Sequence, residues 1–245
     1  MPRLIILSGP SCVGKSPLHR AFEKFYPEIS KEIKKVVLYN SRSPRPGEKD
    51  GINFHFRTRS FIEGLKQKPD FIVMDVRGDL QAVDIAHLRN SFETGDVVFE
   101  GNAYIGAMFI RHPSLESIKK LSIFISPLSK QEIEFFKSIN TIALPEIVTD
   151  IMRRKLLRRT QKQKGILSVA DLENIEKRAK SAYEELRYGY LFDYIIPNSD
   201  GEDSENWDAF YYPIADARKT LNGFTSIIRN NPSPYAEKWE KDLID

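Results

Sequence analysis

Residues 9–16 carry the clearest chemistry in this sequence, a glycine-rich loop that ends in Gly-Lys-Ser. The apolar run 4–8 precedes the loop, and a helical pattern opens at Lys15. A strand, a glycine loop and a helix in this order direct backbone N–H groups and a helix N-terminus at an anion. Lys15 would add a positive charge, and Ser16 would place its hydroxyl on Mg²⁺. The motif predicts a nucleoside triphosphate site rather than a chance glycine-rich turn, with these loop residues: Gly9, Pro10, Ser11, Cys12, Val13, Gly14, Lys15 and Ser16.

A second basic segment lies at residues 41–47, where Arg42 and Arg45 are interleaved with prolines before a glycine. Guanidinium groups match phosphate oxygens through paired hydrogen bonds better than lysine does. The pattern favours a second phosphate-binding loop, and the alternative is a solvated basic loop.

Other charged residues stand at spacings that suit the same chemistry. Glu100 ends the apolar run 97–99 and so falls at the carboxyl end of a predicted strand, where α/β proteins build their sites. Arg154 and Arg158 are four residues apart and share one helix face. The alternatives are a strand-end charge facing solvent and an exposed, solvated helix face.

The elements that must position these residues alternate between strands and helices. Helices are expected at Leu18–Tyr26 and Leu172–Tyr188, and Pro17 is tolerated in the first turn of the former. Strands are expected at 4–8, 36–39, 52–56, 71–74, 96–100, 121–125 and 193–196. This alternation predicts an α/β fold with a parallel sheet flanked by helices.

Composition sets broader bounds. The 245 residues include 37 Lys and Arg against 34 Asp and Glu, and a net charge of +3 gives no argument for a nucleic-acid partner. The single cysteine excludes an internal disulfide and fits a reducing compartment. Because the sequence shows no signal-peptide or transmembrane pattern, we expect a cytoplasmic protein without a membrane partner. An oligomeric partner cannot be read from these patterns.

Two C-terminal stretches stand apart from this pattern. Residues 199–207 are acidic and polar, which predicts a surface loop. Residues 231–245 form a charged tail in which Tyr235 and Trp239 are candidate docking points.

Several of these segments, in this order, resemble the guanylate kinase family of P-loop nucleoside monophosphate kinases. The loop at 9–16 is similar to the family's G-P-S-G-x-G-K-S-T, and residues 41–56 are similar to T-T-R-x-P-R-x-G-E-x-x-G-x-x-Y-x-F. Residues 153–160 resemble its arginine-rich lid, and Arg178 resembles the arginine of the next helix. Residues 192–198 resemble the closing Y-D-x-x-x-x-N.

The resemblance implies a P-loop NTPase fold with a small acceptor-binding subdomain and a helical lid. We expect a guanylate kinase-like domain over residues 1–230 followed by the tail at 231–245. The expected parts are a core at 1–39, 94–150 and 190–230, an acceptor subdomain at about 40–93 and a lid at about 151–180. Residues 127–150 are longer than the family requires.

The resemblance also implies an activity, the transfer of the γ-phosphoryl group of ATP to a nucleoside monophosphate, with GMP as the default acceptor and Mg²⁺ entering with ATP. It assigns Lys15, Arg154, Arg158 and Arg178 to catalysis. Asn198 would contact the donor base, with a turn asparagine as the alternative. The acceptor phosphate would lie near Ser41, Arg42, Arg45 and Glu100.

Four single positions depart from the family pattern. Cys12 replaces a glycine of the loop, and Pro17 replaces Thr or Ser after Gly-Lys-Ser. Asn102 stands where a second Asp is usual, and Asn40 stands where Thr is usual.

The acceptor base pocket departs further. Alignment puts Ile72 at a base-reading Glu, Gln81 at a Tyr and Val83 at a Thr or Ser. Three nearby carboxylates are candidate substitutes: Asp75, Asp79 and Asp84. Unpaired guanine N–H groups would cost about 1–3 kcal/mol each. Two alternatives to a GMP kinase therefore stay open, a nucleotide-binding or protein-interaction module with little activity and a kinase for another phosphorylated acceptor.

Overall fold

Five strands form the larger of two sheets, and every neighbouring pair in it runs parallel. In spatial order they are β2 (Lys34–Lys35), β7 (Val97–Gly101), β1 (Leu4–Ser8), β8 (Lys120–Ser126) and β9 (Tyr194–Pro197). The computed structural model that gives this arrangement describes residues 2–45, 47–139 and 142–245. Central β1 is fully buried because it is apolar on both faces. The predicted parallel sheet is confirmed.

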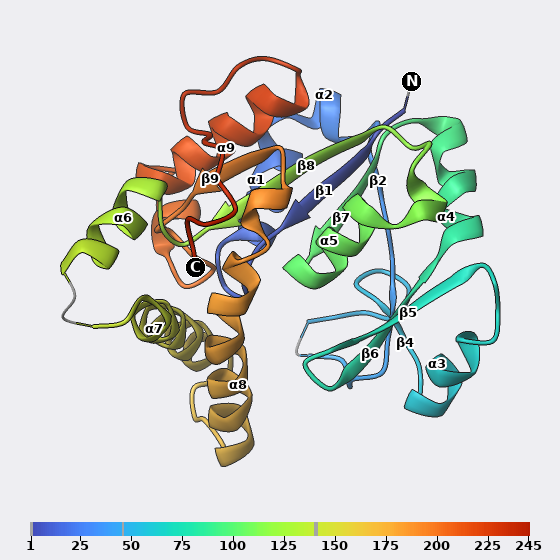
Figure 1. Cartoon of the computed structure of the whole chain (residues 1–245), viewed down its shortest axis with the longest axis horizontal. Coiled ribbons are helices and arrows are strands. Elements are labelled where there is room, and N and C mark those ends of the chain that lie inside the picture. The colour runs from blue at the N-terminus through green and yellow to red at the C-terminus, as the bar shows by residue number, and fades with distance from the viewer. Residues whose placement is uncertain (1, 46, 140–141) are drawn as a thin grey trace.

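Helices cover both faces of this sheet (Figure 1). On one face α1 (Lys15–Phe25) packs against α9 (Ala215–Ile228), and the rings of Phe22 and Phe224 meet edge to face at 5.1 Å. On the other face α5 (Ala103–Arg111) contacts β1, β7 and β8. Asn102 caps α5, since its side-chain oxygen accepts a hydrogen bond from the Ile105 N–H at 3.0 Å. Two further helices are α2 (Pro27–Ser30) and α6 (Lys130–Ile139).

A smaller sheet lies beyond the end of β2 (Figure 1). Its spatial order is β4 (His55–Phe56), β3 (Tyr39–Asn40), β6 (Asp79–Asp84) and β5 (Phe71–Val76). The predicted strand at 36–39 is therefore wrong in its bounds, because most of that stretch crosses from the large sheet to the small one. The six-residue strand β6 is not predicted at all, because acidic residues at both ends and a central Gln81 hide its alternation.

The two faces of the small sheet differ in character. One face buries Leu80 and Ala82 against α3 (Arg59–Leu65). Asn40 pairs directly with Gln81, and since side chains alternate along a strand, both lie on the opposite face. Helix α4 (Ile85–Ser91) then returns the chain to the core. The small sheet thus presents two carboxamides away from its own core.

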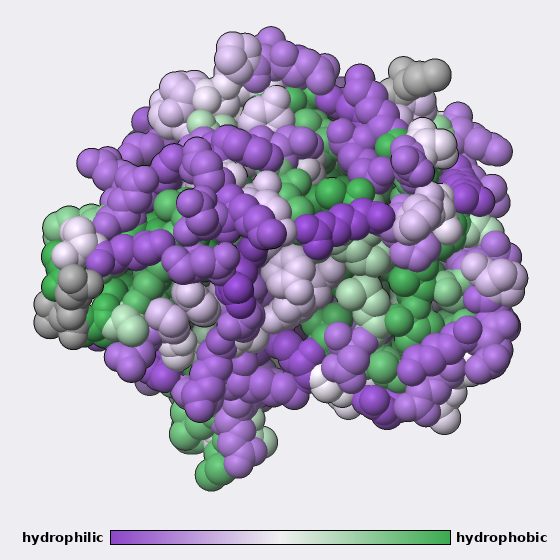
Figure 2. Space-filling model, viewed as in Figure 1, coloured by the Kyte–Doolittle hydropathy of each residue, from purple (hydrophilic) through white to green (hydrophobic). Residues whose placement is uncertain are grey.

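Helices α7 (Leu144–Lys164) and α8 (Val169–Leu186) pack side by side as an arm that projects from the core (Figure 1). Met152 and Leu156 of α7 and Ala179 of α8 are fully buried. The turn between the helices exposes Ile166, and Figure 2 shows apolar surface at the lower end of the molecule, where the tip of the arm lies. The arm is packed at its base and solvated at its tip.

The last residues pack onto the core beside β9. Glu237 forms an antiparallel bridge with Ile195, and Trp239 is 2% exposed beside Phe124. Trp239 is therefore docked as predicted, whereas Tyr235 is 39% exposed. None of the helices in the described ranges combines the length and the apolar character needed to span a bilayer.

Candidate active site

The loop at residues 9–16 joins β1 to α1 and is strongly coiled. Gly9, Cys12 and Gly14 all have positive φ, of 146°, 69° and 104°. A side chain on Gly9 would meet the carbonyl oxygen of Ile125 at 2.3 Å, so glycine is required there. Cys12 adopts the left-handed conformation in which glycine is the usual residue. The loop therefore keeps its shape despite the cysteine, at the expense of local strain.

The Cys12 side chain is buried at the base of the loop. Its Sγ lies 3.4 Å from the carbonyl oxygen of Lys155 on α7. Burial, reinforced by the charge of Glu202, raises the pKa of the Cys12 thiol to about 12. The thiol is thus neutral and serves as packing between the loop and the arm.

Lys15 is buried inside the loop. Its Nζ donates hydrogen bonds to the carbonyl oxygens of Gly9 at 2.8 Å and Pro10 at 2.6 Å. Burial lowers its pKa, and the carboxylates of Glu202, Glu185 and Glu100 oppose that shift. The ammonium is held at the centre of the loop, where a phosphate chain would be cradled.

Ser16 and Glu100 meet at the carboxyl ends of the central strands. The Ser16 hydroxyl donates to Glu100 Oε1 at 2.7 Å, and Lys35 Nζ lies 3.5 Å from Glu100 Oε2. A hydroxyl and a carboxylate are the hard oxygen ligands that Mg²⁺ prefers, directly or through water. The two residues therefore fit a magnesium ion that arrives with a nucleotide.

The basic loop that starts at Ser41 is held in shape by Glu48. Arg42 donates to both Glu48 oxygens, at 2.6 and 2.7 Å, and the Arg45 backbone N–H donates to the same carboxylate at 2.7 Å. The Arg42 guanidinium also lies over the rings of Phe54 and Phe56. Burial, together with the charge of Arg42, lowers the pKa of Arg45 to about 10.

Ser41, at the start of this loop, also contacts the small sheet. The Ser41 hydroxyl accepts a hydrogen bond from the Leu80 N–H at 2.8 Å, so it already braces the small sheet. Pro46, one of the punctuating prolines, lies outside the described residues.

These two loops line one cavity of about 450 Å³ between the core, the small sheet and the arm. Among the described residues, nine basic side chains line it against four acidic ones. The basic residues are Lys15, Arg20, Lys35, Arg42, Arg45, Arg77, Arg159, Lys177 and Arg178. The acidic residues are Glu48, Asp79, Glu100 and Glu202. Such an excess of positive charge in a walled cleft suits a polyanion.

The arm arginines divide between the cavity and the solvent. Arg178 on α8 lines the cavity and is 6% exposed. Burial, followed by repulsion from Arg159, Arg45 and Arg77, holds its pKa well below the usual range. Its buried Nε has no hydrogen-bond partner among the described residues.

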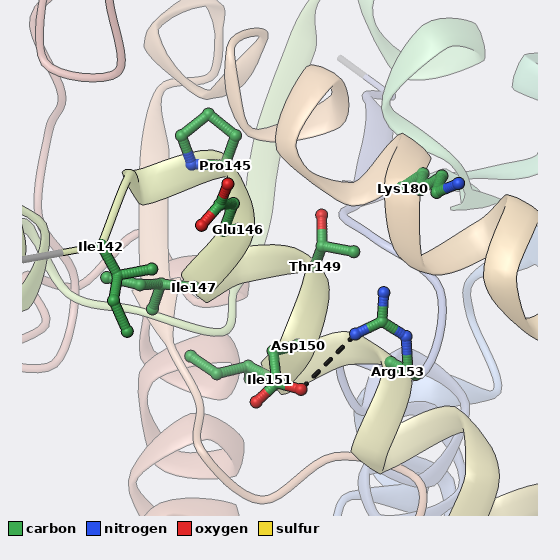
Figure 3. Close-up of a pocket in the computed structure, with 9 residues that line it drawn as sticks. All are labelled: Ile142, Pro145, Glu146, Ile147, Thr149, Asp150, Ile151, Arg153 and Lys180. Atoms are coloured by element: carbon green, nitrogen blue, oxygen red, sulfur yellow. Dashed lines mark hydrogen bonds and ion pairs between the residues drawn. The ribbon is translucent and has the colours of Figure 1, made fainter.

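Arg154 and Arg158 lie outside that cavity, with side chains 68% and 71% exposed. Arg154 pairs with Asp150 at 2.7 Å. Asp150 lines a separate depression at the base of the arm. Figure 3 shows this depression and the ion pair between Asp150 and Arg153. The sequence missed Arg159, which does line the cavity and whose Nη1 pairs with Glu202 Oε2 at 2.6 Å.

The segment 199–207 is irregular over most of its length, as predicted for a loop, but it is partly buried and does not lie on the surface as predicted. Asp200 and Trp207 are each 8% exposed. The Asp200 carboxylate accepts a hydrogen bond from the Ala217 N–H at 3.0 Å, and the Trp207 Nε1–H donates to the Asp200 carbonyl oxygen at 2.8 Å, so both buried polar groups are satisfied. The segment packs against the phosphate loop and delivers Glu202 to the cavity. Asn198, just before it, is 1% exposed, and its Nδ2 donates to the carbonyl oxygens of Val13 and Asp200. The structure thus gives Asn198 a bracing position beneath the loop.

The three candidate carboxylates of β5 and β6 differ in their position relative to the cavity. Asp79 lines the cavity beside Gln81 on β6. Asp75 instead accepts the Gly78 N–H at 2.7 Å, and Asp84 caps α4 by accepting the His87 N–H at 2.8 Å. Ile72 and Val83 are direct cross-strand partners and form an apolar pair.

The parallel sheet, the loop between β1 and α1 and the cationic cavity define a P-loop nucleotide-binding protein. A family model described as guanylate kinase matches residues 1–152. A guanylate kinase of Vibrio parahaemolyticus is 30% identical over 198 residues, covering 80% of each chain. One of Synechococcus sp. is 27% identical over 213 residues, covering 86% of this chain and 82% of the relative.

A crystal structure of guanylate kinase from Anaplasma phagocytophilum shares the fold. Its TM-score is 0.55 at 21% identity, and the match covers 94% of this chain and 85% of that one. On the family match and the Vibrio relative, the chain belongs to the guanylate kinase family.

Proposed function

We propose that this protein transfers the γ-phosphoryl group of ATP to GMP, giving ADP and GDP. The observation that carries the proposal is the single cavity in which the phosphate loop and the Arg42–Arg45 loop face each other. The guanylate kinase relatives supply the identity of the reaction. We also propose that it works in the cytoplasm, without a nucleic-acid or membrane partner, in keeping with its single cysteine.

In the reaction, a phosphate oxygen of GMP attacks the γ-phosphorus, and the bond from that phosphorus to the β–γ bridging oxygen breaks. ADP leaves with the electron pair. Because this transfer needs little covalent work from the protein, catalysis rests on alignment and charge neutralisation. Lys15 and the loop amides would hold the β- and γ-phosphates, and Arg42 and Arg45 would hold the acceptor phosphate. For Arg42 this means exchanging contacts with Glu48 for contacts with phosphate.

Mg²⁺ would be held near Ser16 and Glu100 and, when bound, would neutralise charge on the phosphate chain. Glu100 would also keep the Ser16 hydroxyl oriented, as their 2.7 Å hydrogen bond supports. Arg178, joined by Arg159, would face the transferring group from the arm. We propose the arm as a lid that excludes water, so that ATP is not hydrolysed instead.

For the acceptor base, we propose Asp79 as the reading carboxylate. Guanine presents adjacent N1–H and amino donors, which a carboxylate accepts together. Asp79 lines the cavity, and its carboxylate forms no hydrogen bond or ion pair with the other described residues. Gln81, two residues along the same strand, would contact the guanine O6 from beside it.

The test is ADP release by purified protein with Mg·ATP and a panel of GMP, dGMP, AMP, CMP, UMP and IMP. We expect turnover with GMP that is abolished in Lys15→Ala. Asp79→Asn should lower kcat/KM for GMP more than tenfold, while Asp70→Asn, an exposed change before β5, should leave it unchanged. Turnover with another monophosphate but not with GMP would overturn the proposed acceptor. Absence of turnover with every member of the panel would overturn the kinase itself.

A further inference from the structure

Arg77 lies at the tip of the β5–β6 hairpin, in a position that arginine rarely occupies. Val76 pairs with Asp79, so Arg77 and Gly78 alone make the turn, with φ of 59° and 87°. Two central residues with positive φ define the tight hairpin turn for which Asn-Gly and Asp-Gly are preferred. The backbone of an arginine is strained there, and backbone strain at the edge of a site points to a role in that site.

The Arg77 side chain crosses from the small sheet to the core. Its Nη1 donates to the Ser11 hydroxyl in the phosphate loop at 3.0 Å, and its Nη2 pairs with Glu185 Oε1 on α8 at 3.0 Å. Glu185 is fully buried and also accepts from the Ser181 hydroxyl at 3.1 Å. The guanidinium is therefore held by a fixed anion on one side while its other side faces the phosphate loop.

The contacts of Arg77 leave its donors incompletely used. Its buried Nε has no partner among the described residues, and Ser11 offers only a neutral hydroxyl. A phosphate oxygen is a stronger acceptor for a guanidinium than a hydroxyl is. The charge of Arg77 also lowers the pKa of Lys15, Arg45 and Arg178, after burial in each case. Arg77 thus belongs to the same cationic cluster as the residues of both phosphate sites.

We propose that Arg77 contacts the phosphoryl group in transit, exchanging the Ser11 hydroxyl for a phosphate oxygen while Glu185 keeps the guanidinium in place. The proposal rests on the proposed function, because it assigns a further residue to that reaction. The β5–β6 hairpin belongs to the small sheet, which also carries the Arg42–Arg45 loop proposed to bind the acceptor phosphate. Ser11 belongs to the phosphate loop proposed to bind ATP. Arg77 therefore lies between the proposed donor and acceptor sites, where its guanidinium would face the equatorial oxygens that carry the charge of the moving group.

The test compares Arg77→Met with Arg57→Met, an arginine directly after β4 that lies outside the cavity and pairs with Asp50. With Mg·ATP and GMP, Arg77→Met should lower kcat about 100-fold, as loss of one pre-organised donor does, with little change in KM for either substrate. Arg77→Lys should recover only part of kcat, since lysine cannot bridge two partners in a fixed fork. Arg57→Met should match the wild type.

Removing Arg77 alone leaves Glu185 buried without its partner, so Arg77→Met is repeated in an Arg77→Met/Glu185→Gln double variant that removes both charges. Folding of each variant is checked by thermal unfolding. A folded double variant with wild-type kcat would overturn the proposal. A rise in KM at unchanged kcat would also overturn it, because that outcome means ground-state binding only.

A binding measurement separates this proposal from the proposed function. Mg·ADP with aluminium fluoride mimics the phosphoryl group in transit, and its affinity is measured by calorimetry with and without GMP. Arg77→Met should weaken the fluoride complex about 100-fold and leave Mg·ADP binding unchanged. If the wild type phosphorylates no acceptor, the proposed function fails, and this measurement still decides the role of Arg77. Equal affinity of variant and wild type for the fluoride complex would refute it.

Discussion

Two adjacent arginines on α7 give the sharpest test of how the arm serves the site. The Arg159 side chain is 11% exposed and its Nη1 lies 2.6 Å from Glu202 Oε2 at the cavity. The Arg158 side chain is 71% exposed and lies 3.7 Å from Asp203. Since consecutive residues of a helix point about 100° apart, only one of the two can face the substrates. We predict that it is Arg159.

The expected magnitudes differ widely. Arg159→Met would remove a donor to the transferring group and should lower kcat about 10²–10³-fold, or about 2.7–4 kcal/mol of transition-state stabilisation. Arg158→Met would break only a solvent-screened ion pair worth about 0.2–1 kcal/mol of folding free energy. Its kcat should stay within about twofold of the wild type. The assay is steady-state ADP release with saturating Mg·ATP and GMP.

Loss of the Arg159 guanidinium would also affect folding. Arg159→Met alone leaves the Glu202 carboxylate in the interior without its partner, which would destabilise the fold by about 3–5 kcal/mol. The double variant Arg159→Met/Glu202→Gln removes both charges, and urea unfolding of each variant shows whether the fold survives. A loss of kcat in Arg158→Met equal to that of the double variant would refute the assignment of Arg159.

Three further predictions concern groups outside the reaction itself. Because burial raises the pKa of Cys12 to about 12, its thiol should not react with a disulfide reagent at pH 8 in the native protein. It should react only after unfolding. Trp239→Ala should lower the free energy of unfolding in urea by about 3–5 kcal/mol, whereas the half-exposed Tyr235→Ala should stay near the wild type. Hydrogen bonds from Lys164 and Ser168 hold the pKa of Asp171 at about 2, below its ordinary 3.8. The ionised Asp171 therefore stabilises the start of α8 fully above about pH 4, and this stabilisation is lost as the pH falls toward 2. In Asp171→Asn, the hydrogen-exchange rate of amides at the arm tip should no longer show this dependence on pH.

The sequence predicted best what local patterns determine. The phosphate loop, the long helix ending near Leu186 and the buried strand β1 all follow from short-range spacing and apolar runs. Arg42, Arg45 and Glu100 reach the cavity because a loop motif and a strand end fix their places.

What the sequence could not predict depends on tertiary contact. The spacing of Arg154 and Arg158 puts them on one face of a helix, but nothing local says which face meets the cavity. Packing of Met152 and Leu156 against α8 sets that rotation and turns Arg159 inward.

The same holds for groups whose burial depends on a distant partner. Glu202 has the sequence surroundings of a surface acid, and it lies beside the phosphate loop because Arg159, 43 residues earlier, and Lys15 supply opposite charge. The sequence around Arg77 is likewise typical of a solvated turn. In the folded protein its side chain instead contacts Ser11 and Glu185, which are distant in the sequence. A polar residue can be buried only where another group forms a hydrogen bond or ion pair with it. A single sequence does not show which distant residue supplies that partner.

These ion pairs offset the repulsion among the basic side chains that line the cavity. Three cavity arginines are each anchored by a carboxylate, Arg42 by Glu48 of the same loop, Arg77 by Glu185 and Arg159 by Glu202. Arg178 has no such anchor among the described residues, and burial together with three neighbouring arginines holds its pKa well below the usual range. A phosphate chain entering the cavity would supply the missing anion to Arg178 first. The phosphate charge would then offset the repulsion among these arginines, which links substrate binding to the stability of the assembled site.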